Sequence, residues 1–498
     1  MAHPLILALD QGTTSTRAIL FDLAGQALGE ASRPLAQHYP ADGWVEHDAE
    51  EIYEAAVMVM AEAVANAGAE MAQVAAIGIT NQRETVVLWD RATGAPVHRA
   101  IVWQDRRTAG LCEALRRQGA ETHVTEVTGL LIDPYFTGTK LAWMLDHVPD
   151  ARERAEAGEL LAGTIDSWLI WKLTAGKSHV TDATNASRTL LFDIRAQAWS
   201  EAMLDLFKVP RAILPEVRDS AGLFGETDAG LLGRAIPICG VAGDQQAALM
   251  GQGCVAPGQM KATYGTGCFL LVNTGEAAPV SQARLLTTVA ARIDGRTTYA
   301  LEGAIFIAGA AIQWLVEGLG VDSPAAAEAL ARKARPDHGV VLVPAFTGLG
   351  APWWDAEARG ALSGLTRDAG LPEIAAAAYD ASAYQTADLI EAMASDAPEA
   401  FGEGSELRID GGMSRSPWFA QRLADLTGQR VARASYEETT ALGAALFAGL
   451  GAGLYPDVEA AAAARPTTEP STPALDPDQR QAGQARWRDA VRRVLGHG

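Results

Sequence analysis

The sequence predicts an α/β protein built from two related halves. Segments typical of strands and of helices alternate along the chain, which favours an α/β class. The length of 498 residues exceeds what one hydrophobic core usually supports. Two turns of glycine and hydroxyl residues, at 12–15 and 265–267, each lie between apolar strands about half a chain apart. These three observations together predict a duplicated fold with two large domains.

In the first half, apolar segments at residues 5–10, 17–22, 74–80 and 84–90 are predicted to be strands. A helix is expected to begin after Asp48, which can cap it, and Glu51 stands where a capping-box carboxylate belongs. A short strand at 236–242 delivers Asp244, and residues 245–251 then become helical.

The second half shows a similar alternation of predicted strands and helices. Residues 260–273 and 287–301 are expected to form antiparallel strands, 303–318 a helix and 407–410 a strand. A glycine turn and a helix from about Pro417 complete a strand–turn–helix unit. Glycines and prolines around 250–256 favour a boundary there, which predicts domains 1–252 and 253–498. Residues 460–477 indicate a loose connection to a terminal helix.

Composition and charge exclude several classes of protein. Hydrophobic residues make up 48% and charged residues 20% of the chain, as in ordinary globular proteins. A net charge of −21 opposes binding to nucleic acid and anionic membranes. No apolar run is long enough to span a membrane, and the N-terminus lacks the basic region of a signal peptide. The four cysteines show no metal-ligand spacing and are expected to be small buried residues of a cytoplasmic protein.

The two turns, each of which contains glycine and hydroxyl residues, are candidate phosphate-binding loops. Exposed N–H groups and hydroxyls can bind phosphate oxygens. Asp10 precedes the first turn and can hold Mg²⁺ through water, while Arg17 follows it and can contact phosphate. The alternative is a plain hairpin in which Asp10 satisfies the amides of the turn.

Asp244 is well placed to accept a hydroxyl proton, because it ends a strand between the two halves. The compatible alternative is that it caps the following helix. Arg83 and Glu84 follow another strand and can bind the hydroxyls of a polyol; the alternative is an exposed surface pair. Trp103 and Tyr135 can offer flat apolar faces, or can simply be core residues.

Ten segments of the chain resemble the FGGY carbohydrate kinases, and the resemblance extends over residues 5–450. They are DQGTTSTR (10–17), NQRET (81–85), IVWQ (101–104), IDPYF (132–136), TNASR (184–188), GDQQAAL (243–249), TYGTGCF (263–269), EGAIFIAGAAIQW (302–314), PAFTGLGAPWWD (344–355) and DGG (410–412). The resemblance implies two duplicated ribonuclease-H-like domains of the actin/Hsp70 ATPase type, with an active-site cleft between them. NQRET, IVWQ and IDPYF are similar to segments of the members that act on glycerol.

The resemblance therefore implies a phosphotransferase that uses ATP and Mg²⁺ to convert glycerol to sn-glycerol 3-phosphate. The implied roles are general base for Asp244; metal positioning for Asp10 and Asp244; glycerol hydrogen bonding for Arg83, Glu84, Tyr135, Asp244 and Gln245; glycerol walls for Trp103 and Phe269; phosphate contact for Thr13, Thr14, Ser15, Arg17 and Thr266; and nucleotide contact for Gly309, Gln313, Gly411, Gly412 and Met413. The first domain would bind the polyol and the second the nucleotide. The expected assembly is either a homodimer or a homotetramer.

Two departures from the family pattern keep alternatives open. Ser416-Pro417 stands where the members that act on glycerol usually carry an Asn pair, which puts one nucleotide contact in doubt. The segment 225–237 is shorter than the loop that binds fructose 1,6-bisphosphate in some relatives, and only Arg234 resembles it. The competing functions are an FGGY kinase for erythritol, xylulose or ribulose, and a non-catalytic nucleotide switch of the actin type.

Overall fold

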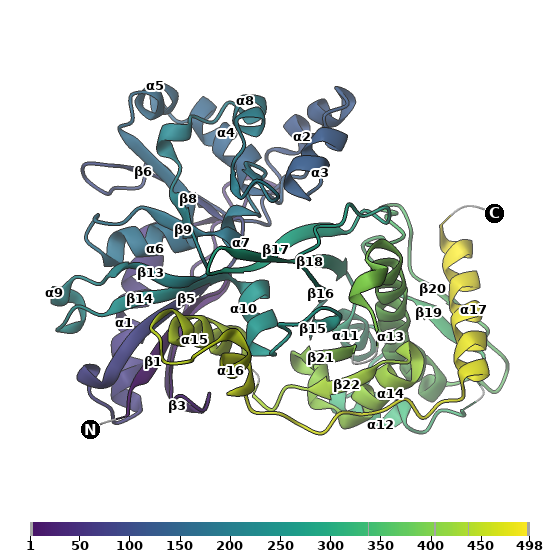
Figure 1. The fold of residues 1–498 in the computed structure, drawn as a ribbon. Helices are drawn as coiled ribbons and strands as arrows, with labels where there is room; N and C mark the ends of the chain where they lie inside the picture. Colours follow the sequence, from purple (N-terminus) through teal and green to yellow (C-terminus); the bar gives the residue numbers. More distant parts are fainter. Residues whose placement is uncertain (1–2, 337, 403–404, 437, 496–498) are drawn as a thin grey trace.

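Two six-stranded sheets organise the chain (Figure 1). The computed structural model describes residues 3–336, 338–402, 405–436 and 438–495. The first sheet has the order β13-β14-β5-β1-β2-β3. Its strands are β1 (Leu5–Gln11), β2 (Ser15–Phe21), β3 (Ala27–Pro34), β5 (Val74–Asn81), β13 (Ala221–Glu226) and β14 (Pro237–Gly243).

The second sheet belongs to the second half of the chain and has the order β17-β18-β16-β15-β21-β22. Its strands are β15 (Gln259–Tyr264), β16 (Cys268–Gly275), β17 (Leu286–Ile293), β18 (Arg296–Ile305), β21 (Glu406–Asp410) and β22 (Arg430–Arg433).

The duplication is visible in the topology of the two sheets. Strands β3-β2-β1-β5-β14 and β18-β16-β15-β21-β22 follow the same order. In both sets the first three strands are antiparallel and the last two run parallel to the third. The glycine and hydroxyl turns join β1 to β2 and β15 to β16. The two predicted turns therefore occupy equivalent positions in equivalent sheets.

The chain also forms smaller sheets and helices. A four-stranded sheet contains β4 (Glu46–His47), β6 (Val86–Asp90), β7 (Ala100–Ile101) and β8 (Leu160–Thr164). Strand pairs form from β9 (Val180–Asp182) with β12 (Glu216–Arg218), β10 (Phe192–Asp193) with β11 (Ala198–Trp199), and β19 (Val341–Val343) with β20 (Ala361–Ser363). The helices are α1 (Ala49–Asn66), α2 (Ala109–Arg117), α3 (Glu121–Thr128), α4 (Thr137–His147), α5 (Ala151–Glu156), α6 (Ile165–Leu173), α7 (Ala183–Ala186), α8 (Glu201–Phe207), α9 (Ala229–Leu232), α10 (Asp244–Gly251), α11 (Gly309–Glu317), α12 (Pro324–Ala331), α13 (Leu371–Asp396), α14 (Pro417–Thr427), α15 (Thr439–Gly451), α16 (Val458–Ala463) and α17 (Pro477–Val494).

Helices cover both faces of the first sheet. Leu7 and Leu9 of β1 face the core shared with α1, while Ile6 and Ala8 face the core shared with α15. A strand that is buried on both faces has a continuous apolar sequence, as β1 does. The close approach of α15 requires glycine, because a Cβ at Gly78 of β5 would collide with the backbone of this helix.

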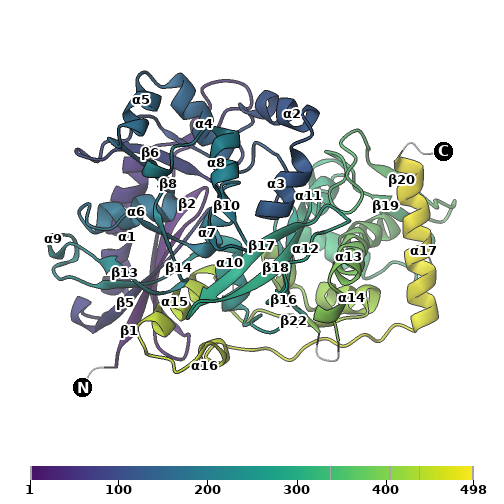
Figure 2. The same ribbon diagram turned by 45° about the horizontal axis from the view of Figure 1, so that its top comes forward.

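The position of α15 bears on the division of the chain into domains. Helix α15 follows the second sheet in sequence but packs against β1, β5 and β14 of the first (Figure 1). The segment after α16 then crosses back to α17, which lies at the far edge of the second half (Figure 2). The predicted division at residue 252 stays a prediction, because α15 of the second half of the chain packs on the sheet of the first half.

Most of the predicted elements form within one or two residues of their expected ends. Asp48 caps α1 by accepting hydrogen bonds from the amides of Glu50 and Glu51. The predicted helix over 303–318 is wrong at its start, because residues 303–305 end β18 and the helix begins at Gly309. Residues 460–463 belong to α16, so the loose connection is shorter than expected.

The four cysteines are buried and free, as expected. Among the residues that the structure describes, no helix is both long and apolar enough to cross a membrane.

Candidate active site

One edge of the first sheet collects the predicted acceptor-binding side chains. Strands β1, β5 and β14 are parallel neighbours, so their carboxyl ends meet at the same edge. Asp10 is the penultimate residue of β1, Arg83 follows β5, and Asp244 follows β14. The topology therefore brings together three residues that lie far apart in the sequence.

Arg83 connects the predicted acceptor residues to one another. Its Nε atom lies 3.1 Å from Oδ1 of Asp244 and 3.7 Å from Oε1 of Glu84. Arg83 and Glu84 are 3% and 1% exposed, so the alternative of an exposed surface pair is wrong. Glu84 adopts a positive φ of 63°, and this turn lets two adjacent side chains approach each other.

Two buried residues that the sequence did not single out complete this ion-pair network. Glu302 of β18 lies 2.6 Å and 3.1 Å from the two terminal nitrogens of Arg83. Arg188 donates to Glu84 at 2.6 Å and to Glu302 at 3.1 Å. Glu302 belongs to the second sheet and its partners to the first half, so the network joins the two halves. Burial alone would raise the pKa of Glu302, but Arg188 and Arg83 lower it to about 2.

Asp244 occupies the first turn of α10, after Gly243 at the N-cap position. Its Oδ1 atom accepts a hydrogen bond of 2.7 Å from the amide of Gln245, but the N-cap is Gly243 and none of the described side chains caps this helix, so the capping alternative is wrong. The side chain is 34% exposed. Burial raises the pKa of Asp244, and the charges of Arg83 and Lys261 oppose that rise.

Lys261 is another buried charge that the sequence did not single out. Its Nζ atom donates to Oε1 of Gln245 and, at 2.9 Å, to Oγ1 of Thr263. Burial lowers the pKa of Lys261, while Asp410 and Asp244 raise it. Lys261 therefore fixes Gln245 and places a cation near Asp244.

Asp10 lies close to other negative charges. Burial first, and then the negative charges of Asp244 and Glu438, raise the pKa of Asp10 to about 7. Arg17 forms an ion pair with Glu438 beside the start of α15. No group of three or more His, Cys, Asp or Glu side chains is arranged to hold a metal in the part of the chain that the structure describes. Mg²⁺ needs only one or two carboxylates when phosphates and waters supply its other ligands, so Asp10 and Asp244 fit that role.

The first turn is closed as a hairpin and also carries polar groups toward neighbouring aromatic rings. The amide of Gly12 donates to the carbonyl of Ser15 at 3.0 Å, and Thr14 is exposed. Trp103 Nε1 donates to Oγ1 of Thr13 at 2.9 Å. The ring of Trp103 contacts the ring of Tyr135 edge to face at 5.5 Å. The first turn is therefore a hairpin, and its residue Thr13 contacts the predicted aromatic pair of Trp103 and Tyr135 through Trp103.

The second turn packs against the start of α11 and the DGG segment. The carbonyl of Thr266 accepts from the amides of Ala308 and Ala310 at 2.9 and 3.0 Å. A Cβ at Gly309 would approach the carbonyl of Gly265 to 2.5 Å and the sulfur of Met413 to 3.9 Å. Thr266, Gly309 and Met413 are thus brought together as the sequence predicts.

Four further predicted residues lie around this second turn. Gly411 has a φ of 84°, and a Cβ there would meet the backbone of Tyr264. Gly412 begins a short 3₁₀ helix. Phe269 is a half-buried residue of β16, opposite Thr263 of β15. Gln313 lies on the exposed side of α11 and bonds Glu317 at 2.6 Å.

Ser416 and Arg234, which lie in the two segments that depart from the family pattern, have structural roles. Ser416 caps α14 by accepting a hydrogen bond of 3.0 Å from the amide of Phe419. Arg234 donates to the backbone carbonyls of Met71, Ala72 and Val74. Both side chains therefore serve the fold at these positions.

Comparisons with known proteins agree with this architecture. Residues 5–251 match the N-terminal domain of the FGGY family of carbohydrate kinases, and residues 260–452 match its C-terminal domain. The chain is 59% identical over 492 residues to a glycerol kinase from Alcanivorax borkumensis, covering 99% of this chain and 98% of that relative. A glycerol kinase from Methylobacterium nodulans is 58% identical over 495 residues, with 99% and 98% covered.

A solved structure of Plasmodium falciparum glycerol kinase with ADP is similar, with a TM-score of 0.94 and 34% identity over 99% of this chain and 98% of that one. A gluconate kinase from Lactobacillus acidophilus, at 20% identity, has a TM-score of 0.88 over 99% of this chain and 98% of that one, and shows the fold alone. The expected two-domain α/β fold of the actin/Hsp70 ATPase type is confirmed.

Proposed function

Because the chain belongs to the FGGY family of carbohydrate kinases, we propose that it transfers the γ-phosphoryl group of ATP to a terminal hydroxyl of glycerol. The product is sn-glycerol 3-phosphate. The observation that carries this proposal is the buried contact of Arg83 with Glu84 and Asp244, beside the Trp103–Tyr135 ring pair. Relatives named glycerol kinase match nearly the whole chain at 56–59% identity.

Glycerol has three hydroxyls and one apolar carbon face, and the site offers groups for both. Arg83 donates hydrogen bonds, Glu84 accepts them, and Tyr135 and Gln245 supply further polar groups. Trp103 and Phe269 would cover the carbon face. Burial of these polar groups makes the site selective, because an acceptor lacking a matching hydroxyl would leave one of them without a partner.

Asp244 would accept the proton of the attacking hydroxyl and hold its oxygen in line with the phosphorus. Phosphoryl transfer depends mainly on alignment and on charge stabilisation, and orientation alone lowers such barriers by about 7–11 kcal/mol. Burial raises the pKa of Asp244, whereas its ion pair with Arg83 favours the charged form that can accept a proton. Its contribution is therefore chiefly geometric.

The two turns would hold the nucleotide from opposite sides. Thr13, Thr14, Ser15 and Arg17 would contact its phosphates from the first half, and Thr266 would do so from the second. Gly309, Gln313, Gly411, Gly412 and Met413 would hold the remainder of the nucleotide. Asp10 and Asp244 would bind Mg²⁺, which when bound neutralises phosphate charge. The raised pKa of Asp10 supports this assignment, since a cation there would relieve the repulsion from Asp244.

The acceptor is tested by measuring ATP-dependent phosphorylation of glycerol, erythritol, xylulose and ribulose. Glycerol should exceed the others in kcat/KM by about a hundredfold or more, as expected of a site with matched buried polar groups. Preference for a ketose would favour the sugar-kinase alternative. ADP release without any dependence on an acceptor would favour the nucleotide switch.

We further propose that the protein acts in the cytoplasm as a homodimer or homotetramer. The reduced, buried cysteines support that location, and sedimentation of the purified chain tests the assembly.

A further inference from the structure

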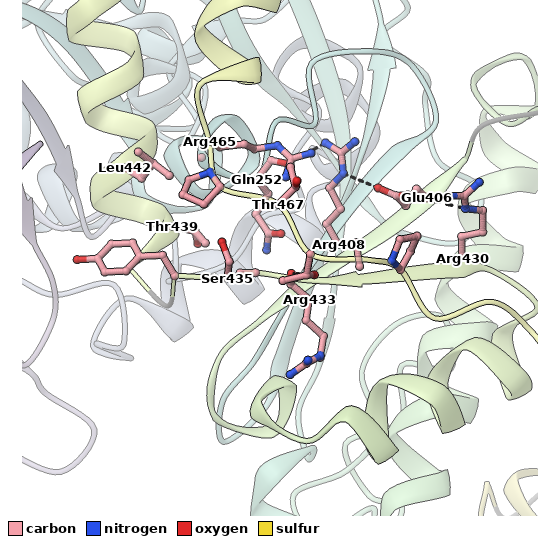
Figure 3. Close-up of a pocket in the computed structure, with 17 residues that line it drawn as sticks. Gln252, Glu406, Arg408, Arg430, Arg433, Ser435, Thr439, Leu442, Arg465 and Thr467 are labelled. Atoms are coloured by element: carbon pink, nitrogen blue, oxygen red, sulfur yellow. Dashed lines mark hydrogen bonds and ion pairs between the residues drawn. The ribbon is translucent and has the colours of Figure 1, made fainter. Parts of the chain in front are cut away.

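Arginine side chains line a pocket of the structure (Figure 3). It has a volume of about 200 Å³ and lies between strands β21 and β22, the start of α15, and the segment 465–470. Four of its lining residues are arginines, whereas Glu406 is the one acidic residue among the lining residues that the structure describes. The whole chain carries a charge of −21, so this concentration of positive charge opposes the overall field.

One carboxylate serves two of these four arginines. Arg408 donates to Oε1 of Glu406 at 2.8 Å and to the carbonyl of Gln252 at 2.7 Å. Arg430 lies 4.0 Å from the other oxygen of Glu406 and is 58% exposed. Arg433 bonds only the carbonyl of Arg415, at 3.4 Å, within the described chain. Among the described lining residues, the one carboxylate, that of Glu406, therefore pairs with both Arg408 and Arg430.

Arg465 has no hydrogen-bond or ion-pair partner among the described residues, although it is only partly exposed. The guanidinium groups of Arg465 and Arg408 lie next to each other, because both pack against Gly253. A Cβ added at Gly253 would collide with Arg465 and would lie 3.2 Å from Nη1 of Arg408. Burial and the charge of Arg408 lower the pKa of Arg465. Glu406 offsets part of the repulsion between these two adjacent cations, and a bound anion would reduce it further.

Hydroxyl groups lie next to this pair of arginines. Figure 3 shows Arg465 and Arg408 together at the top of the pocket, with Thr467 and Ser435 below them. One guanidinium group can donate two parallel hydrogen bonds to two oxygens of a phosphate, and nearby hydroxyl groups can donate further hydrogen bonds. A small phosphate group with its substituent fits about 200 Å³.

We propose that this pocket binds a small phosphate-bearing anion, either inorganic phosphate or a phosphate monoester, between Arg465 and Arg408. The site would join elements of both halves, since α15 packs on the first sheet and β21 belongs to the second. Its wall includes Gln252 and Thr439, which both donate to Oδ2 of Asp410, at 2.9 and 2.5 Å. Asp410 leads directly into the Gly411-Gly412 turn, so the pocket is connected to that turn by one residue.

The test is calorimetric titration of the full chain with inorganic phosphate and, separately, with glucose 6-phosphate. ADP and glycerol are kept in excess so that the probe does not enter the proposed active site. We expect saturable binding of at least one probe with a Kd of about 1 mM or tighter. Binding of phosphate alone identifies the free ion as the ligand, and tighter binding of the ester identifies an organic phosphate.

Variants separate this pocket from other phosphate sites. Arg465→Gln and Thr467→Glu should each weaken binding at least tenfold, the second by placing a carboxylate in the pocket. Arg117→Gln, which removes the same charge from a side chain that is 71% exposed, should leave the affinity unchanged. Equal affinity in Arg465→Gln and Arg117→Gln, equal binding of succinate, or no saturable binding would overturn the proposal. The outcome does not depend on kinase activity, so failure of the proposed function would be recognised separately.

Discussion

Replacing Glu302 by Gln should uncouple the two halves of the protein. The substitution keeps the shape of the side chain but removes the charge that pairs with Arg83 and Arg188. Glu302 is 2% exposed, and breaking a buried ion pair by removing one partner costs about 3–5 kcal/mol. The pKa of Glu302 supports the same magnitude, because a shift from 4.5 to about 2 corresponds to about 3 kcal/mol.

The same shift sets the sign of the pH dependence. A carboxyl whose pKa is lower in the folded protein stabilises it above pH 4.5, and this stabilisation is lost as the pH falls toward 2. Wild-type protein should therefore lose stability over that range more steeply than Glu302→Gln.

Urea denaturation at pH 7, followed by tryptophan fluorescence, measures the loss of stability, and glycerol KM reports whether Arg83 keeps its position. We expect a free energy of unfolding lower by about 3–5 kcal/mol and a KM raised at least tenfold. Glu276→Gln is the matched control, since Glu276 pairs with Arg296 on the surface with 67% of its side chain exposed; it should cost less than about 1 kcal/mol. Equal effects of the two substitutions would refute the structural role of the network.

Two other substitutions test the remaining charges of the site. Asp10→Asn should stabilise the unliganded protein at pH 8, because the raised pKa of about 7 makes the wild type lose stability as the pH rises from about 4 to 7. In the same variant, kcat/KM for MgATP should fall at least tenfold. A profile of Tm against pH that matches the wild type would contradict the assignment of Asp10. Lys261→Met should raise the KM for glycerol about tenfold, because Gln245 loses a charge-assisted hydrogen bond worth about 1.5–3 kcal/mol. The exposed Lys177→Met serves as its control, and a normal KM in Lys261→Met would exclude Lys261 from the site.

The main elements of the fold could be predicted because local patterns determine them. Asp48 marks the start of α1, and glycine turns mark both hairpins. The end of β18 could not be separated from the start of α11, because residues 303–312 are almost continuously apolar or glycine and such a run has neither helix nor strand periodicity. The return of α15 to the first sheet depends on tertiary packing, which no local pattern encodes.

The position of Asp10, Arg83 and Asp244 at strand ends could be predicted, whereas the buried partners of these residues could not. Lys261 is the one charge of β15, and Glu302 lies in the apolar second half of β18. A charge in such a segment is itself a signal of a partner, but the sequence does not identify which one. Glu302 reaches Arg83 across 219 positions of the chain. The contact between Arg83 and Glu84 depends on the positive φ of Glu84, which is uncommon for a residue other than glycine.

The most direct test of the proposed mechanism is the turnover of Asp244→Asn. If Asp244 accepts the hydroxyl proton, kcat with glycerol and ATP should fall by about 10²–10⁴, while the affinity for ADP changes less than about threefold, a difference below about 0.7 kcal/mol. Asp205→Asn, at an exposed position of α8, should behave as wild type. Turnover of Asp244→Asn at the wild-type rate would remove Asp244 from the mechanism.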